Sequence, residues 1–256
     1  MGMRLRVLGC SGGIGGSLHT TSFAVDHDIL IDAGTGVGEL SLDELSRIDH
    51  IFITHSHMDH ICNLPLLLDS VVGMRHHPVT VYALPETLEV LRQHIFNWKI
   101  WPDFNTIPNI DHPVMRYRPI CVGETVELQG RKIRAVPAVH TVPAVGYHLD
   151  SGTASLLFSG DTYVNDELWF AANRIDNLHY LIIETAFSNG EKELADLSKH
   201  LCPSLLVAEL AKFHGDAEVF ITHLKPDEVE LIMHQIEQSI GANSPKMLLN
   251  NQVFEF

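Results

Sequence analysis

The 256-residue chain lacks any apolar run of the ~18–20 residues that a helix needs to span a bilayer. Its first residues contain no apolar stretch of the length found in signal peptides. Internal repeats, low-complexity tracts and long linkers are absent as well. We therefore expect a single domain over residues 1–256, located in the cytoplasm and without a membrane partner.

Cysteines and basic residues are scarce. The four cysteines, Cys10, Cys62, Cys121 and Cys202, are scattered and form no CxxC motif, which is typical of reduced thiols. The chain contains 17 Lys and Arg residues and 32 Asp and Glu residues, so its formal net charge is −15. Because so acidic a surface repels phosphate backbones, nucleic acid is a disfavoured partner, although a local contact with it is not excluded.

Hydrophobic patterning predicts strands followed by helices in both halves of the chain. The expected strands cover residues 4–8, 23–25, 29–31, 50–54, 79–83, 114–118, 125–128, 132–139, 144–149, 155–159, 180–184 and 218–222. The expected helices cover residues 59–72, 85–97, 166–172, 203–213 and 227–239. This order favours an α/β fold, a four-layer αββα sandwich in which two sheets pack face to face and helices cover the outside.

Residues 85–112 form a helical and aromatic insertion, which we interpret as a lid. It contains Phe96, Trp98, Trp101 and Phe104. These rings pack within the lid, contact a second copy in a homodimer, or stack on a nucleobase. The glycine-rich residues 9–16 end the first predicted strand but precede no helical pattern, so we predict a turn at the mouth of a site rather than a phosphate loop.

Histidine is abundant, with 17 copies and no run of six that would mark a purification tag. The segment His55-Ser56-His57-Met58-Asp59-His60 places three imidazoles and one carboxylate between a predicted strand and a predicted helix. In extended backbone, His55 and His57 point to the same side, while Asp59 and His60 lie on the following turn. One pair can therefore hold one metal ion and the other pair a second.

A metal ion needs three or four ligands, so further ligands are expected on distant loops. His140, Asp161 and His223 each follow a predicted apolar strand, where loop ends converge. Five imidazoles and two carboxylates without cysteine suit two divalent ions, with Zn²⁺ preferred and Mn²⁺ or Fe²⁺ as alternatives.

The His-x-His-x-Asp-His segment resembles the hallmark of the metallo-β-lactamase superfamily, and the similarity extends over nearly the whole chain. The resemblance implies that His55, His57 and His140 bind one metal ion. It implies that Asp59, His60 and His223 bind the other, with Asp161 bridging the two. Asp32 matches an early aspartate of the family that orients a ligand histidine.

Three segments look like those of class II 3′,5′-cyclic-nucleotide phosphodiesterases and RNase Z-type phosphodiesterases: residues 82–104, 139–147 and 181–203. The resemblance places His200 beside the scissile phosphate. It implies attack on phosphorus by a hydroxide that bridges the metal ions, with His200 protonating the leaving oxygen. We therefore predict His200, Asp59 and Asp32 as the residues that take part in catalysis, and a small-molecule phosphodiester as the substrate.

Three alternatives stay open. The first is an RNase Z-like tRNA 3′-processing endonuclease, which the acidic charge disfavours. The second is another hydrolase of the superfamily, a lactonase or a thioesterase. The third is a catalytically inactive binding protein on the same fold, which the complete set of seven ligands disfavours.

Overall fold

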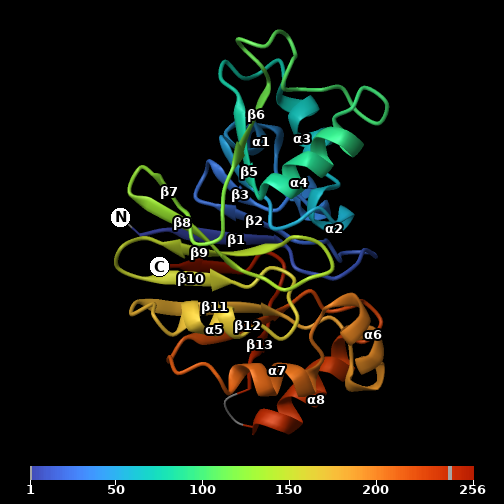
Figure 1. The fold of residues 1–256 in the computed structure, drawn as a ribbon, viewed down its shortest axis with the longest axis vertical. Coiled ribbons are helices and arrows are strands. Elements are labelled where there is room, and N and C mark those ends of the chain that lie inside the picture. Colours follow the sequence, from blue (N-terminus) through green and yellow to red (C-terminus); the bar gives the residue numbers. More distant parts are fainter. Residues whose placement is uncertain (1, 242–243) are drawn as a thin grey trace.

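The computed structural model describes residues 2–241 and 244–256 and contains two seven-stranded sheets (Figure 1). The first sheet has the strand order β14-β1-β2-β3-β4-β5-β6. Its strands are β1 (Arg4–Gly9), β2 (Ser22–Val25), β3 (Ile29–Ile31), β4 (His50–Phe52), β5 (Val79–Ala83), β6 (Met115–Pro119) and β14 (Val253–Glu255).

The second sheet has the order β13-β12-β11-β10-β9-β8-β7. Its strands are β7 (Thr125–Leu128), β8 (Arg131–Pro137), β9 (Val145–Asp150), β10 (Ser155–Phe158), β11 (Leu178–Glu184), β12 (Glu218–Thr222) and β13 (Lys246–Met247). In both sheets three antiparallel pairs at one side give way to three parallel pairs at the other.

Helices cover the outer face of each sheet, as the four-layer prediction required (Figure 1). Beside the first sheet lie α1 (Leu42–Ser46), α2 (Met58–Ile61), α3 (Leu64–Val71) and α4 (Pro85–Val90). Beside the second lie α5 (Asp166–Ala172), α6 (Lys192–Ser198), α7 (Pro203–Leu210) and α8 (Val229–Ile240). One hydrophobic cluster fills the space between the sheets and a further cluster lies under each helical layer, so the predicted αββα sandwich is confirmed.

Several predicted boundaries were wrong. The strand expected over 50–54 ends at Phe52, and the helix expected over 59–72 is two helices. The break occurs at Asn63, whose N–H donates to the carbonyl oxygen of Ala33 (2.9 Å). Pro65, in the first turn of α3, then starts a new helix because it lacks an N–H for the preceding one.

Two other predicted helices end early, and six elements of the described residues were not predicted. The helix expected over 85–97 changes to a π-helical turn at Leu91–Ile95, and the one over 203–213 ends as α7 at Leu210. The elements that were not predicted are α1, α6, β13, β14 and two 3₁₀ helices, Thr35–Glu39 and Asn189–Glu191.

The insertion at residues 85–112 divides its aromatic side chains between core and surface. Phe96 and Phe104 are buried in the cluster beneath the first helical layer, whereas Trp98 is exposed. The lid and dimer roles of this segment stay predictions. Within residues 2–241 and 244–256, no helix is both long enough and apolar enough to cross a bilayer.

Candidate metal centre

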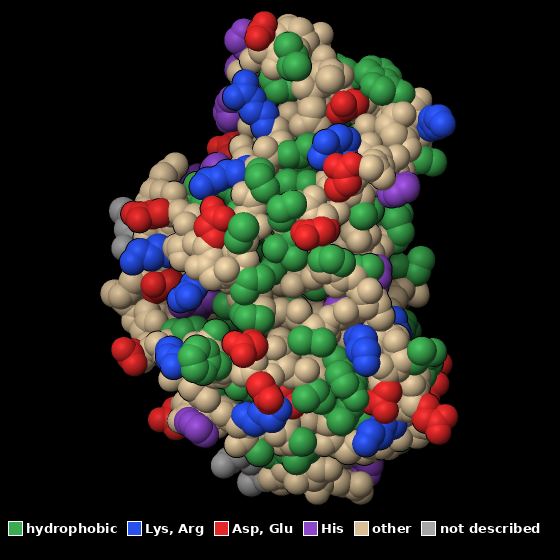
Figure 2. Space-filling view, viewed as in Figure 1, with side chains coloured by type: hydrophobic (Ala, Val, Ile, Leu, Met, Phe, Trp, Pro, Cys, Tyr) green, Lys and Arg blue, Asp and Glu red, His purple; other side chains and the backbone are tan. Residues whose placement is uncertain are grey.

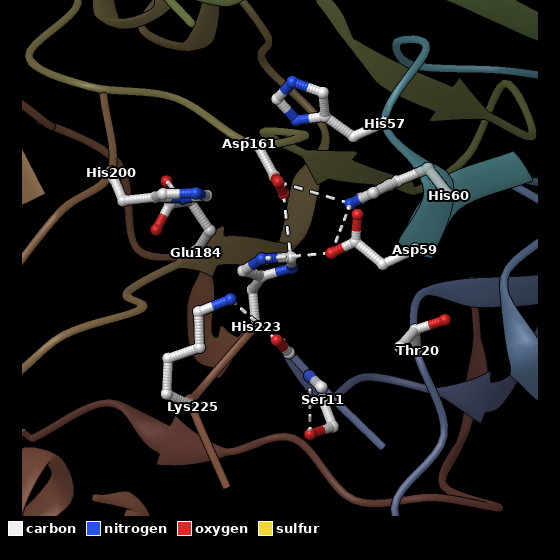
Figure 3. A network of polar contacts seen from close by, with 12 residues as sticks. Ser11, Thr20, His57, Asp59, His60, Asp161, Glu184, His200, His223 and Lys225 are labelled. Atoms are coloured by element: carbon white, nitrogen blue, oxygen red, sulfur yellow. Dashed lines mark hydrogen bonds and ion pairs between the residues drawn. The ribbon is translucent and has the colours of Figure 1, made fainter. Parts of the chain in front are cut away.

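The predicted ligands follow strands of both sheets and lie close together. Figure 3 shows His57, Asp59, His60, Asp161 and His223 among them. In the first sheet, the segment from His55 to His60 follows β4. In the second sheet, His140 follows β8, Asp161 follows β10 and His223 follows β12 directly. The carboxyl ends of parallel strands meet at one edge of a sheet, and this brings residues distant in sequence into one site.

The first group consists of His55, His57 and His140, each of which offers a ring nitrogen within 4.8 Å of the others. Nδ1 of His57 lies 3.1 Å from Nε2 of His140. Two ligand nitrogens on a tetrahedral zinc ion, each bonded at ~2.0–2.1 Å, lie about 3.3 Å apart. The spacing therefore fits shared ligation of one ion.

The second group consists of Asp59, His60, Asp161 and His223. Oδ2 of Asp161 lies 3.2 Å from Nε2 of His60, and Oδ1 lies 3.4 Å from Nδ1 of His223. Oδ2 also lies 3.7 Å from Nε2 of His55, which belongs to the first group. Asp161 thus lies between the groups, where a bridging ligand would have to lie; its bridging role stays a prediction.

Hydrogen bonds on the outer side of the rings fix which nitrogen of several histidines faces the centre. His60 Nδ1 donates to Oδ2 of Asp32 (2.7 Å). Asp32 also accepts from the hydroxyl of Thr54 (2.8 Å), so Thr54 Oγ1 is left to accept from Nδ1 of His55 (3.0 Å). His140 Nδ1 donates to the carbonyl oxygen of Lys199 (3.0 Å). Nε2 of all three histidines is therefore the nitrogen available to a metal ion.

Three ring nitrogens in this centre are buried and have no hydrogen-bond partner in the described part of the chain: Nε2 of His55, Nε2 of His60 and Nδ1 of His223. A buried polar atom without a partner is destabilising, whereas the lone pair of a neutral imidazole is a good metal ligand. Burial lowers the pKa of His140 to about 4 and that of His223 to about 3, which keeps both rings neutral. The residues present therefore fit a pair of divalent ions.

His60 and Asp161 carry the opposite charge tendencies. Burial alone would lower the pKa of His60, but Asp161 and Asp32 hold it well above its usual value. Burial alone would raise the pKa of Asp161, but His223 and His60 hold it well below. With no cation bound, these directions favour a protonated His60 beside an ionised Asp161, and a divalent cation bound between them would replace that proton.

His200 lies beside these groups and is held by Glu184, which the sequence analysis had not assigned a role. His200 Nδ1 donates to Oε1 of the fully buried Glu184 (2.8 Å). Burial would lower the pKa of His200, but the Glu184 carboxylate raises it above the usual value. Glu184 could have been found as a carboxylate at the end of a four-residue apolar run, at the same strand end as the ligands.

His200 also offers a nitrogen within 4.8 Å of ligand atoms of His140 and Asp161. The structure thus brings together all eight of the residues predicted to bind metal ions or contact the substrate, and Asp32 lies directly behind His60. Their individual roles stay predictions.

Two residues of the centre, Asp32 and His223, have an unusual backbone conformation that helps to set the direction of their side chains. Asp32 (φ 56°) and His223 (φ 63°) adopt the left-handed region, which is strained for residues other than glycine. The predicted turn at residues 9–16 lies against His223, because a Cβ on Gly12 would come within 2.5 Å of the His223 carbonyl oxygen. The glycine turn thus lies at the centre, as expected.

Comparison with known proteins shows similarity to one superfamily of hydrolases. Residues 27–234 match the family described as "Beta-lactamase superfamily domain". A probable 3′,5′-cyclic-nucleotide phosphodiesterase from Yersinia pestis is 27% identical, over 75% of this chain and 63% of that protein. A nuclear ribonuclease Z from Triticum aestivum is 32% identical, over 39% of this chain and 53% of that protein. The chain therefore spans less than two thirds of the length of these relatives.

Among solved structures, the metallo-β-lactamase fold protein YhfI from Bacillus subtilis superimposes with a TM-score of 0.79. The match covers 100% of this chain and 99% of that one at 17% identity. The expected family resemblance and the metallo-β-lactamase fold are both confirmed. This fold implies that divalent metal ions are bound, and the two His/Asp groups are where this chain would hold them.

Proposed function

We propose, because this chain belongs to the β-lactamase superfamily, that its His/Asp centre hydrolyses a small phosphodiester, in particular a 3′,5′-cyclic nucleotide. One observation carries the proposal. The buried nitrogens of His55, His60 and His223, which have no hydrogen-bond partner among the described residues, lie around Asp161, and His200 with its Glu184 partner lies at the edge of the same centre. The first set fits metal ions, and the second provides a positioned proton donor.

When bound, a pair of divalent ions supplies an acidified water molecule and neutralises charge on phosphate oxygens. The chain's own residues hold the two groups in place and protonate the leaving oxygen. Asp161, between the two groups, fixes their separation. Glu184 occupies Nδ1 of His200, so Nε2 is the nitrogen left to donate a proton to the leaving oxygen. The Yersinia relative, by its name, supports a cyclic nucleotide as the substrate class.

The test is a substrate series with protein reconstituted in Zn²⁺ or Mn²⁺. We expect hydrolysis of bis-p-nitrophenyl phosphate. We also expect hydrolysis of cyclic AMP or cyclic GMP to the nucleoside monophosphate, which chromatography detects. An Asp161→Ala variant, which removes the carboxylate shared by the two groups, should be inactive. Metal-loaded protein that hydrolyses a lactone or a thioester but no phosphodiester would overturn the proposal.

The wheat ribonuclease Z match favours a second candidate, cleavage at the 3′ end of tRNA precursors. Charge opposes it, since the net charge is −15. On the face shown in Figure 2, Lys and Arg side chains lie singly among acidic and apolar ones and form no continuous basic surface. Processing of a precursor tRNA at a rate exceeding that of cyclic nucleotides would establish the second candidate instead.

A further inference from the structure

Lys225 lies beside the centre and has no part in the groups described so far. It comes two residues after His223, on the loop that follows β12. Its backbone N–H donates to the carbonyl oxygen of Ala186 (3.1 Å), and its ammonium donates to the carbonyl oxygen of Gly12 (2.8 Å). Lys225 is half-buried, and these two hydrogen bonds hold its backbone and its ammonium in place.

The ammonium of Lys225 points toward the side of the centre where His200 and His223 lie (Figure 3). The positive charge of Lys225 contributes to lowering the pKa of His200, which requires the two groups to be near each other. The ring of Phe187 lies on another side of the ammonium, 5.8 Å from it. Lys225 therefore extends along the edge of the centre.

This ammonium has no anionic partner among the residues that the structure describes, which is also true of several exposed lysines, but it is set apart by its place at the edge of the centre. Lys212 pairs with Asp166 and Glu209, and Lys246 pairs with Glu218. Within the described residues, the one hydrogen bond that this ammonium donates goes to a neutral carbonyl, which uses one of its three N–H donors. In a chain with 32 acidic and 17 basic residues, an unpaired and partly desolvated cation is a place where an external anion would bind.

We propose that Lys225 binds a non-bridging oxygen of the substrate's phosphate and positions that phosphate against His200. The proposal rests on the proposed function and extends it to one substrate-positioning residue. A competing explanation is purely structural, namely that Lys225 pins the glycine turn at Gly12 onto His223. Under the proposal, phosphate affinity depends on the positive charge of Lys225. Under the structural explanation, removing the side chain changes metal content and Tm instead.

The experiment compares metal-loaded wild type with Lys225→Met and Lys225→Arg. Lys225→Met keeps most of the aliphatic stem and removes the charge, while Lys225→Arg keeps the charge. The matched control is Lys246→Met, at an exposed lysine whose surface ion pair contributes little to stability. The readouts are KM and kcat on bis-p-nitrophenyl phosphate, Kd for inorganic phosphate by calorimetry, metal content and Tm.

We expect Lys225→Met to raise KM and the phosphate Kd about 10- to 100-fold, the range for a hydrogen bond to a charged group. The fall in kcat should be smaller, metal content should match wild type, and Tm should fall by only about 2–4 °C, because the Gly12 carbonyl loses one hydrogen-bond donor. Lys225→Arg should restore most of the phosphate affinity, and Lys246→Met should leave every readout unchanged.

Unchanged KM and phosphate Kd in Lys225→Met would overturn the proposal, as would wild-type protein that binds no phosphate. Loss of metal or a fall in Tm that accounts for the weaker binding, without restoration by arginine, would also overturn it and establish the structural role. Wild type that binds phosphate through Lys225 but cleaves no phosphodiester would refute only the proposed function.

Discussion

Asp32 lies behind His60 and is placed to orient that ring without facing the centre itself. Its carboxylate is fully buried and accepts hydrogen bonds from the N–H and the hydroxyl of Thr54 and from Nδ1 of His60. Burial raises the pKa of Asp32 despite these donors. The accepted hydrogen bonds offset part of the cost of burying this charge. The same bonds favour the form of His60, and through Thr54 that of His55, that turns Nε2 inward.

Replacing Asp32 with asparagine should weaken metal binding about 10- to 100-fold, because the amide offers donors as well as an acceptor and no longer selects one form of His60. The measurement is competition with a chromophoric chelator. Asp43→Asn, at an exposed carboxylate on α1, is the matched control and should bind metal like wild type. Equal affinity in the Asp32 and Asp43 variants would show that Asp32 does not orient His60.

His200→Ala should lower kcat by about 10²- to 10⁴-fold, the usual contribution of a general acid, while metal content stays at the wild-type value. The measurements are steady-state kinetics and elemental analysis of the same sample. His234→Ala, at an exposed histidine on α8, controls for the loss of an imidazole. A variant that loses metal instead would make His200 a ligand together with His140 and Asp161.

At the scale of elements, a buried ion pair joins the two sheets. Arg131 begins β8 in the second sheet, and its guanidinium donates to both oxygens of Asp28 (2.6 and 2.7 Å), in the turn between β2 and β3 of the first. It also donates to Asp26 (3.0 Å). Burial would raise the pKa of Asp28, but Arg131 holds it below 3.8. The pair ties the two sheets together on the side of the sandwich away from parallel strands β10 to β13.

Arg131→Met should lower the free energy of unfolding by about 3–5 kcal/mol, because Asp28 is left buried without its partner. Urea denaturation measures this, and Arg116→Met, at an exposed arginine of β6, is the control. Since the folded pKa of Asp28 is depressed, its contribution is fully present above about 3.8, its usual value. The contribution is lost as pH falls through the folded pKa, so the difference between wild type and variant should shrink in acid. A difference that stays constant at every pH would refute this coupling.

The elements that the sequence predicted are those whose signals are local. Apolar strands that end in a histidine or an aspartate gave both the sheets and the positions of His140, Asp161 and His223. The break between α2 and α3 has one local signal, Pro65, but its place at Asn63 depends on the hydrogen bond to Ala33, a tertiary contact that the sequence does not show. The short edge strands β13 and β14 carry little apolar pattern and form only by pairing with β12 and β1.

Glu184 shows the same limit at the site. It lies in the predicted strand 180–184, but its role depends on His200, 16 residues further along the chain. No spacing rule connects the two positions, since α6 and the loop after it bring His200 back to the end of β11. The proposed role of Lys225 likewise could not be predicted from the sequence, because it depends on Gly12 and His200, which are near Lys225 only in the folded chain.

At the scale of the whole molecule, the two sheets contribute jointly to one centre. The segment from His55 to His60 comes from the first sheet, whereas His140, Asp161 and His223 come from the second. Each of the two groups contains residues from both sheets. Bound metal ions would therefore link the halves of the sandwich, and their binding free energy would add to the stability of the fold.

The number of metal ions bound per chain tests this account most directly. After reconstitution with Zn²⁺ or Mn²⁺ and removal of free metal by gel filtration, elemental analysis should give about two ions per wild-type chain. The Asp161→Ala variant should hold fewer, because its carboxylate lies between the groups. A wild-type content below about one ion per chain, in folded protein and with both metals, would contradict the account.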